Sequence, residues 1–490
     1  MAYPVPYLPT SYLEANALSA PDRPAIFDSG RVLSFGELRE RVHAAAWALR
    51  EAGLRPGEVA AVALPNVWEY VVLELAIPLL GAVLLPLPPS LGEAEKRWAL
   101  QFTGARLTVQ QPEAERLCSA PYRGRLEPPQ PDPDRVVEIA LTSGTTGRPK
   151  LASLHAALKQ STFEAFTSRL EVTAEDRVLI ITPVTQGIGG MCLYCLRRGA
   201  ALVMLREPRF SPEHTLRTAA ATASTLLVGV PTNVIRMLDS PELAAADLSA
   251  ARCTAVAGSP MPPEAARLWE TRTGSRVCVF YGSMDAGQAA VGSPSDPQEK
   301  RWTTVGRPHD RVQVRITSEG EICMRGPTVQ NRYWGEERGP YAADGWAHMG
   351  DLGFLDEDGY LHVTGRLKDV VIRGGSNVNP HEVEDALRSH PAVADVSVVG
   401  RPDRELGERL VAFVVARGAL RIGDLQVHLG RLGLAKYKWP ELLELVDEIP
   451  LSGPGKVNRK LLREWAARPA GAYPDATTGN GSAGKEEEAS

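Results

Sequence analysis

Short apolar runs and amphipathic helical segments alternate along most of this sequence. Residues 34–55 place Leu38 and Val42 at helical spacing, and Ser34 followed by Glu37 predicts a capping box at the start of that helix. Further helices are predicted at 68–80 and 154–169, and buried strands at 59–64, 82–87, 135–141, 177–182, 201–205, 225–230, 254–257 and 276–281. Such alternation is typical of parallel strands joined by crossover helices. We therefore expect an α/β fold whose large N-terminal domain has stacked, mostly parallel sheets covered by helices.

From about residue 300 onward, the alternation of apolar strands and amphipathic helices no longer continues. In segments 312–316, 321–325 and 360–364, apolar and polar residues alternate, and each segment lies between turns that contain Gly or Asp. This pattern predicts a small β-rich subdomain. A helix at 380–389 and strands at 393–399 and 410–416 then predict a small α+β domain, and the Pro, Gly, Ser and Glu content of the tail predicts disorder. The expected domains are 1–367, 368–467 and a disordered tail, 468–490.

Composition excludes several classes of protein. With 44% hydrophobic and 23% charged residues over 490 positions, the chain can bury a large core. A net charge of −5 and the lack of a dense basic run argue against nucleic-acid binding. The longest apolar stretch, 70–87, contains Glu74 and two prolines, which argues against membrane insertion, and the N-terminus has no signal-peptide pattern. These features predict a soluble cytoplasmic protein, monomeric or homodimeric.

The six cysteines include one C-x-x-C pair, Cys192 and Cys195. The residues around this pair are apolar, and no second pair exists that could complete a metal site. Because a spacing of three also suits a buried helix, we expect both thiols to lie in the core rather than to bind metal or carry out redox chemistry.

The densest polar motif follows a predicted strand and reads Leu-Thr-Ser-Gly-Thr-Thr-Gly-Arg-Pro-Lys, residues 141–150. Its glycines allow backbone N–H groups to converge on a phosphate, and its hydroxyls and Lys150 can add further donors. The spacing does not match a Walker A loop, because Gly144 and Gly147 are three apart and Leu151 follows the lysine. The sequence also lacks the motifs of Rossmann dinucleotide sites, nucleophile-elbow hydrolases, kinases and zincins.

This motif resembles the nucleotide-phosphate loop of the AMP-forming adenylating superfamily, which comprises acyl-CoA synthetases, peptide-synthetase adenylation domains and luciferases. Companion blocks similar to those of the superfamily follow in order at 257–260, 281–285, 320–327, 333–334, 344–351, 365–369, 374–375, 437–440 and 455–459. The resemblance spans about 430 residues and is strongest to bacterial acyl- or aryl-CoA synthetases. It implies an acid–thiol ligase that uses ATP, Mg²⁺ and CoA and has a mobile C-terminal domain.

The resemblance also assigns a nucleotide site. Its ATP- and AMP-binding residues would be Thr142, Ser143, Gly144, Thr145, Thr146, Gly147, Lys150, Gly258, Ser259, Pro260, Tyr281, Gly282, Ser283, Asp351 and Arg366. Tyr281 would stack on adenine, Asp351 would accept hydrogen bonds from the ribose hydroxyls, and Arg366 would reach ribose or phosphate. Asp285 stands where the superfamily usually has Glu as the Mg²⁺ ligand, and Met284 replaces a usual Thr.

Two lysines are implied to act in catalysis together with Thr145. Lys456 would meet the substrate carboxylate and the α-phosphate, where negative charge accumulates during adenylation. Lys368 occupies the position of the interdomain hinge, and Gly374 and Gly375 would line the path of the thiol.

The sequence constrains the acyl pocket less than it constrains the nucleotide site. Its predicted residues are Gln186, Gly187, Gly189, Val230, Asn233 and Ala257. Segment 183–190 has no carboxylate to pair with an α-ammonium group, so an ordinary α-amino acid is not expected. Gln186 falls where many acyl- and aryl-CoA synthetases have His. Three glycines in this segment suggest room for an aromatic or cyclic carboxylic acid.

Three functions remain open from the sequence. The first is an acyl-CoA synthetase, and the second is a stand-alone adenylation enzyme that loads the phosphopantetheine thiol of a carrier protein. The third, from another class, is a non-catalytic protein that binds acyl-adenylate. The departures at Gln186, Met284 and Asp285 keep the third function open, whereas the presence of Lys150, Asp351 and Lys456 argues against it.

Overall fold

The computed structural model describes residues 11–142, 150–185, 187–207, 209–283, 286–327, 329, 332–336, 339, 341–374, 376–451 and 457–468. The chain divides into two compact units. The first comprises Met1–Thr317, Ile322–Met349 and Leu355–His362, and the second comprises Ser318–Glu321, Gly350–Phe354 and Val363–Ser490. The tail that we predicted to be disordered lies outside the described residues, apart from Arg468.

A nine-stranded sheet forms the centre of the first unit, in the order β14-β13-β12-β11-β10-β8-β9-β1-β2. Its strands are β1 Pro24–Asp28, β2 Arg31–Ser34, β8 Arg177–Ile180, β9 Ala201–Met204, β10 Leu226–Gly229, β11 Cys253–Val256, β12 Arg276–Ser283, β13 Gly287–Val291 and β14 Arg307–Pro308. The six neighbours from β12 to β1 all pair in parallel, and all of them except β1 were predicted as strands. The terminal β1–β2 and β12–β13–β14 pairs are antiparallel and were not predicted.

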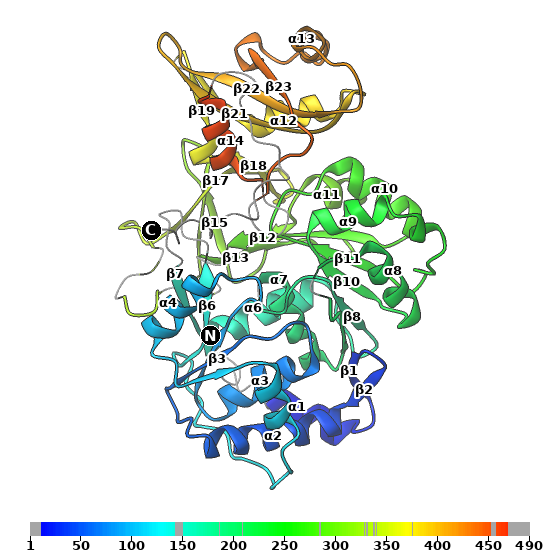
Figure 1. Ribbon diagram of the computed structural model, residues 1–490, viewed down its shortest axis with the longest axis vertical. Coiled ribbons are helices and arrows are strands. Elements are labelled where there is room, and N and C mark those ends of the chain that lie inside the picture. The colour runs from blue at the N-terminus through cyan, green and yellow to red at the C-terminus, as the bar shows by residue number, and fades with distance from the viewer. Residues whose placement is uncertain are drawn as a thin grey trace, which may run out of the picture. The chain divides into compact units, whose positions relative to one another are not determined.

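Helices cover both faces of this sheet (Figure 1). On one face Leu227 of β10 packs with Leu216 of α8, in a core shared with α9 and α10. On the other face its neighbour Val228 packs in a core shared with Phe166 of α6 and with α2 and α3. Successive residues of one strand are therefore buried on opposite sides, which explains the continuous apolar runs in the sequence. The helices of the first group are α8 Pro212–Ala221, α9 Pro231–Leu238, α10 Pro263–Thr273 and the neighbouring α11 Gln298–Thr303.

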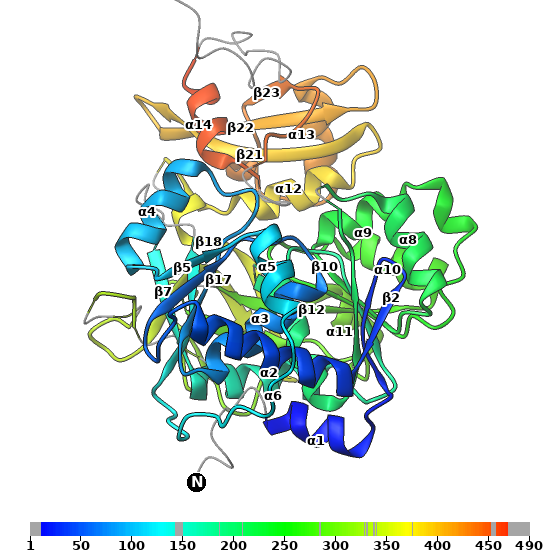
Figure 2. The ribbon, with the colours of Figure 1, turned by 60° about the horizontal axis from the view of Figure 1, so that its bottom comes forward.

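A second sheet in the first unit has the order β5-β3-β4-β6-β7, with strands β3 Val59–Val62, β4 Val83–Pro86, β5 Leu107–Val109, β6 Val136–Thr142 and β7 Lys150–His155. Its helices are α1 Ser11–Ser19, α2 Phe35–Glu51, α3 Trp68–Leu79, α4 Glu93–Thr103, α5 Gln111–Cys118 and α6 Ala156–Arg169. Figure 2 shows α2 beside α3. The predicted capping box of Ser34 and Glu37 is present. The helix predicted to start at residue 154 starts instead at Ala156, because β7 pairs antiparallel with β6.

A four-stranded sheet follows in the order β15-β16-β17-β18, with strands β15 Gln313–Ile316, β16 Glu321–Arg325, β17 Ala347–Leu355 and β18 Leu361–Arg366. Strands β15, β16 and β18 match the segments predicted from alternating apolar and polar residues, whereas β17 was not predicted. Its nine residues include four glycine, histidine and aspartate positions that obscure the strand pattern: His348, Gly350, Asp351 and Gly353.

The C-terminal part of the second unit is a small α+β fold, as predicted. Its sheet has the order β20-β19-β22-β21, with β23 paired to β22. The elements are the 3₁₀ turn η3 Leu367–Asp369, β19 Val371–Arg373, β20 Ser376–Val378, α12 Pro380–Arg388, β21 Val393–Asp403, β22 Gly407–Ala416, α13 Ile422–Arg431, η4 Lys436–Lys438, β23 Leu442–Leu445 and α14 Arg459–Ala466. Helices α12 and α13 pack on one face of the sheet, and α14 packs on the other through Leu462 and Trp465. In the described part of the chain, no helix combines the length and the apolar character needed to cross a bilayer.

The C-x-x-C pair lies in the core, as expected. Cys192 and Cys195 belong to the 3₁₀ helix η1 Cys192–Arg198, which follows α7 Gly187–Met191, and neither is exposed to solvent. Burial raises the pKa of the Cys192 thiol well above its usual value. A protonated, buried thiol is a poor nucleophile and a poor metal ligand, which supports the structural interpretation.

A buried charge cluster joins three elements of the first unit. Lys159 of α6 donates a hydrogen bond to Glu74 of α3 at 2.8 Å and another to Glu138 of β6. The side chains of Lys159 and Glu74 are only 5% and 8% exposed. Burial raises the pKa of Glu74 to about 7, although Lys159 opposes the rise. Because the folded protein keeps this proton to higher pH than the unfolded chain, the carboxyl group makes folding less favourable as pH rises from 4.5 to about 7.

Replacing Lys159 with Met should destabilise the first unit by about 3–5 kcal/mol, the range for leaving buried charges without their partner. The loss should be larger at pH 8 than at pH 5, since Glu74 can take up a proton at the lower pH. Thermal unfolding at both pH values measures this difference. Adding Glu74→Gln to Lys159→Met should recover part of the loss at pH 8. An equal loss at both pH values would contradict this assignment of the cluster.

Candidate active site

Four neighbouring parallel strands bring most of the predicted acyl and adenine residues to one sheet edge. The register aligns Gly229 of β10 with Val256 of β11, and Val256 with Val279 of β12. Val230, Ala257–Gly258 and the end of β12 therefore follow at the same carboxyl edge, which is where open α/β sheets bind ligands. Strand β8 ends beside β10, so the segment after Ile180 reaches this edge as well.

Asn233, a predicted acyl contact, has a local structural role. Its Oδ1 accepts a hydrogen bond from the N–H of Val230 at 2.9 Å and so holds the turn that starts α9. Asn233 is buried, and its Oδ1 lies 2.8 Å from the position that a Cβ at Gly229 would take. The Asn233 side chain therefore fixes the end of β10, and Val230 remains half-buried at the edge.

The predicted adenine residues lie at the ends of β11 and β12. Gly258 has φ +91°, a conformation that favours glycine, and Ser259 and Pro260 follow it. Tyr281 is only 9% exposed. At Gly282 a Cβ would lie 2.5 Å from the carbonyl oxygen of Gly287, so the close approach of β13 requires glycine there.

The hydroxyl of Ser283 holds the turn that follows β12. Its Oγ accepts a hydrogen bond from the N–H of Ala286 at 3.0 Å. Asp285, the predicted Mg²⁺ ligand, lies outside the described residues.

The predicted phosphate loop connects two paired strands. Thr142 at the end of β6 faces Lys150 at the start of β7 in the antiparallel register. The Nζ of Lys150 lies 4.5 Å from the ring centroid of Tyr333, and this cation–π contact fixes the lysine at the base of the loop. Tyr333 is itself held in place by a bridge between its backbone and that of Ala152. This contact of Tyr333 with Lys150 was not predicted from the sequence.

The glycines of the predicted acyl segment differ in role. Gly187 has φ +44°, and a Cβ there would meet no atom of the described residues within 4 Å. At Gly189 a Cβ would lie 2.2 Å from the carbonyl oxygen of Pro183, and at Gly190 it would lie 3.0 Å from that of Val184. Gly189 and Gly190 therefore allow α7 to pack against the preceding turn, and only Gly187 faces open space.

Two predicted nucleotide residues meet within the second unit. Nε of Arg366 on β18 lies 3.1 Å from Oδ1 of Asp351 on β17. The Asp351 side chain is 12% exposed and that of Arg366 is 48% exposed. This ion pair holds the carboxylate in one orientation, and the exposed part of the guanidinium remains available to a ligand.

The predicted hinge residue is adjacent to a buried anchor. Lys368 lies in η3, and its carbonyl accepts a hydrogen bond from Nη2 of Arg463 at 3.2 Å. The next residue, Asp369, is 4% exposed and pairs with Arg463 at 2.8 Å and with Arg459 at 3.4 Å. The turn is therefore tied to α14. Gly374 has φ +55° and donates a backbone hydrogen bond to Leu406 at 2.7 Å.

Several predicted site residues lie outside the described part of the chain. They are Ser143, Gly144, Thr145, Thr146, Gly147, Gln186, Asp285, Gly375 and Lys456, together with the side chain of Thr142.

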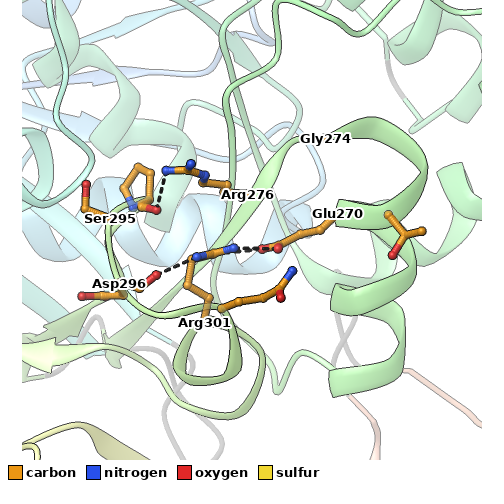
Figure 3. A pocket seen from close by; sticks show the side chains of 9 residues that line it. Glu270, Gly274, Arg276, Ser295, Asp296 and Arg301 are labelled. Atoms are coloured by element: carbon orange, nitrogen blue, oxygen red, sulfur yellow. Dashed lines mark hydrogen bonds and ion pairs between the residues drawn. The ribbon is translucent and has the colours of Figure 1, made fainter.

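A cavity of 430 Å³ lies at the opposite end of β12 (Figure 3). Its lining residues are Glu270, Thr271, Gly274, Arg276, Pro294, Ser295, Asp296, Gln298 and Arg301. Arg301 forms a buried ion pair with Glu270 at 2.7 Å, and Nη1 of Arg276 donates to the carbonyl of Pro294 at 3.0 Å. None of these nine residues belongs to the predicted site, so this cavity is separate from the residues expected to take part in adenylation.

Comparison with known proteins identifies the family. A model of the AMP-binding enzyme family matches residues 13–334, and a model of the AMP-binding enzyme C-terminal domain matches residues 382–456. A feruloyl-CoA synthase from Amycolatopsis sp is 33% identical and aligns over 90% of this chain and 95% of its own. A 3-[(3aS,4S,7aS)-7a-methyl-1,5-dioxo-octahydro-1H-inden-4-yl]propanoyl:CoA ligase from Mycobacterium tuberculosis is 32% identical, over 91% and 96%.

A solved structure agrees with these matches. ATP-bound MatB from Rhodopseudomonas palustris superposes with a TM-score of 0.85 at 27% identity, covering 94% of this chain and 99% of MatB. The expected α/β fold with a smaller C-terminal domain is thereby confirmed, and so is the resemblance read from the sequence motifs. The chain belongs to the AMP-binding enzyme family and is an AMP-forming acid–thiol ligase of the acyl-CoA synthetase type.

Proposed function

We propose that this enzyme activates an aromatic or cyclic carboxylic acid at the edge formed by β8, β10, β11 and β12. A carboxylate oxygen of the acid attacks the α-phosphorus of ATP, the bond to pyrophosphate breaks, and acyl-adenylate forms. The thiol of CoA then replaces AMP. The observation that carries the proposal is the convergence of Val230, Ala257–Gly258 and Tyr281 at this edge.

Each group of residues has a distinct task in this proposal. Tyr281 and Gly258 border the adenine, and Asp351 and Arg366 hold the ribose as a preformed ion pair. Lys150, held by Tyr333, and the hydroxyls of segment 142–146 bind the phosphates. Lys456 neutralises charge on the reacting carboxylate and phosphoryl oxygens. Mg²⁺ shields the phosphate oxygens when it is bound, and we propose Asp285 as its ligand.

The substrate class rests on the acyl segment and on two relatives. Gly187 faces open space next to the turn after β8, which leaves room for a ring. The relatives described above are named for feruloyl and for a bicyclic propanoyl group, and both groups contain rings. Pyrophosphate release measured over a library of carboxylic acids, with and without CoA, tests this proposal. Turnover restricted to short linear acids would contradict it.

The enzyme should reject α-amino acids by at least about a hundredfold in specificity constant relative to the matching acids without the amino group. Segment 183–190 contains no carboxylate, and an unpaired buried ammonium costs several kcal/mol. Competition between phenylalanine and 3-phenylpropanoate, followed by pyrophosphate release, measures the ratio. A preference for phenylalanine would mean that a carboxylate from elsewhere reaches the pocket, and it would overturn both the substrate class and the role of Asp285.

The names of both relatives contain CoA, which supports CoA as the thiol acceptor. The alternative acceptor is the phosphopantetheine of a carrier protein. The two acceptors share the same reactive arm. Mass spectrometry of reactions with equal concentrations of CoA and a phosphopantetheinylated carrier protein separates them. We expect acyl-CoA to be the main product, and exclusive loading of the carrier would support the alternative.

A further inference from the structure

A buried amide clamps the turn that carries the acyl segment. Asn66, in the loop between β3 and α3, is 6% exposed. Its Nδ2 donates to the carbonyl oxygens of Thr182 at 2.9 Å and Ile180 at 3.3 Å. Its Oδ1 accepts from the N–H of Val184 at 2.8 Å. One side chain thus bonds three backbone groups of a segment more than 110 residues away in the sequence.

The chemistry of these three bonds matches a carboxamide. Two carbonyl acceptors and one N–H donor require a group that has two donors at one end and an acceptor at the other. Aspartate could accept from Val184, but it would turn a carboxylate oxygen toward the carbonyls of Ile180 and Thr182. The clamp therefore depends on the amide of Asn66 and not only on its size.

The turn is held from its other side by α7. The backbone of Gly189 lies so close to Pro183 that a Cβ would be 2.2 Å from its carbonyl oxygen. The turn 182–184 therefore lies between the amide of Asn66 and the backbone of α7. Thr182 and Val184 are also buried, so little room is left for the turn to shift.

The loop that carries Asn66 is itself anchored to the large sheet. Oδ2 of Asp28 on β1 accepts a hydrogen bond from the N–H of Trp68 at 2.9 Å, where α3 begins. Nη2 of Arg206, just beyond β9, donates to the same oxygen at 2.8 Å. These bonds fix Asn66 relative to β1 and β9, and through Asn66 they fix the turn after β8.

We propose that Asn66 is a positioning residue for the carboxylic acid substrate, acting through the described residues of segment 180–190, which are the turn 180–185 and the start of α7. This role rests on the proposed function of that segment. The clamp acts at the end of β8. The adenine residues follow β11 and β12, and the phosphate loop follows β6, which is separated from β3 by β4 in the smaller sheet, so binding of ATP should depend little on Asn66.

The test measures the KM values for acid and ATP separately in acid-dependent pyrophosphate release. Asn66→Asp and Asn66→Ala should raise the KM for the acid by about tenfold or more, the scale of losing buried hydrogen bonds. The KM for ATP should change much less. Gly189→Ala should give the same selective rise, because it displaces the same turn from the other side. Far-UV circular dichroism and thermal unfolding establish that each variant is folded.

Glu270→Gln is the matched control. It weakens a buried ion pair in the same unit, at the opposite end of β12, and should lower the melting temperature without a selective rise in the KM for the acid. Folded Asn66 variants with an unchanged KM for the acid, or with equal rises for acid and ATP, would overturn the positioning role. Wild-type enzyme that releases no pyrophosphate with any acid would instead overturn the proposed function together with the role that rests on it.

Discussion

Replacing Lys456 with Ala is expected to slow acyl-adenylate formation by about a hundredfold or more, the scale of one charged contact made in the transition state. Negative charge increases on the phosphoryl oxygens as the carboxylate attacks, and Lys456 is the cation that we propose to meet it. ATP binding should change little. Thioester formation from supplied acyl-adenylate should survive, because we propose that the second half-reaction does not use this lysine.

The structure gives this experiment a matched control. The residues flanking Lys456 are anchored: Leu451 bridges Val457, and the N–H of Asn458 donates to the carbonyl of Pro450 at 2.7 Å. Lys460 lies four residues further on, is exposed, and belongs to α14. Lys460→Ala should leave both half-reactions near wild-type rates. If Lys456→Ala reduced both half-reactions equally, the assignment would fail.

Replacing Lys368 with Pro is expected to leave adenylation largely intact and to reduce thioester formation by about two orders of magnitude or more, as a displaced reactive group does. Proline fixes its own φ near −65° and disfavours helical geometry in the residue before it, here Leu367 of η3. Asp369 is tied to α14 by Arg459 and Arg463, so the backbone at 367–368 is where we expect the small domain to turn.

Single-turnover assays of each half-reaction measure this effect. Lys368→Ala is the control, since it removes the side chain but keeps the backbone free, and it should retain more thioester formation than the proline variant. Thioester formation at the wild-type rate in Lys368→Pro would refute the hinge role. Equal damage to both half-reactions would point instead to a general loss of structure.

The sequence predicted the parallel strands well because their physical signal is local. Strands buried on both faces are continuous apolar runs, as at β10 and β11, and the capping box at Ser34 depends on residues three apart. The strand β7 was not predicted, and its last two residues, Leu154 and His155, were predicted to begin a helix, because small and polar residues suit a helix as well. Only its pairing with β6, which is not a local property, decides its conformation.

The site was harder to predict, for a related reason. A glycine that opens space and a glycine that permits close backbone packing look identical in a sequence, so Gly187 and Gly189 could not be distinguished. Asn233 has the polarity of a pocket residue, yet its Oδ1 bonds the backbone of Val230. Asn66 carried no signal at all, because its partners lie more than 110 residues away.

Acid-dependent exchange of labelled pyrophosphate into ATP, in the absence of any thiol, tests the central claim most directly. The reverse of adenylation regenerates ATP from acyl-adenylate and pyrophosphate, so exchange requires that this intermediate forms on the enzyme. We predict exchange with ring-containing carboxylic acids, loss of exchange in Lys456→Ala, and retention in Lys368→Pro. Formation of ADP and phosphate, or thioester synthesis without any exchange, would contradict the account.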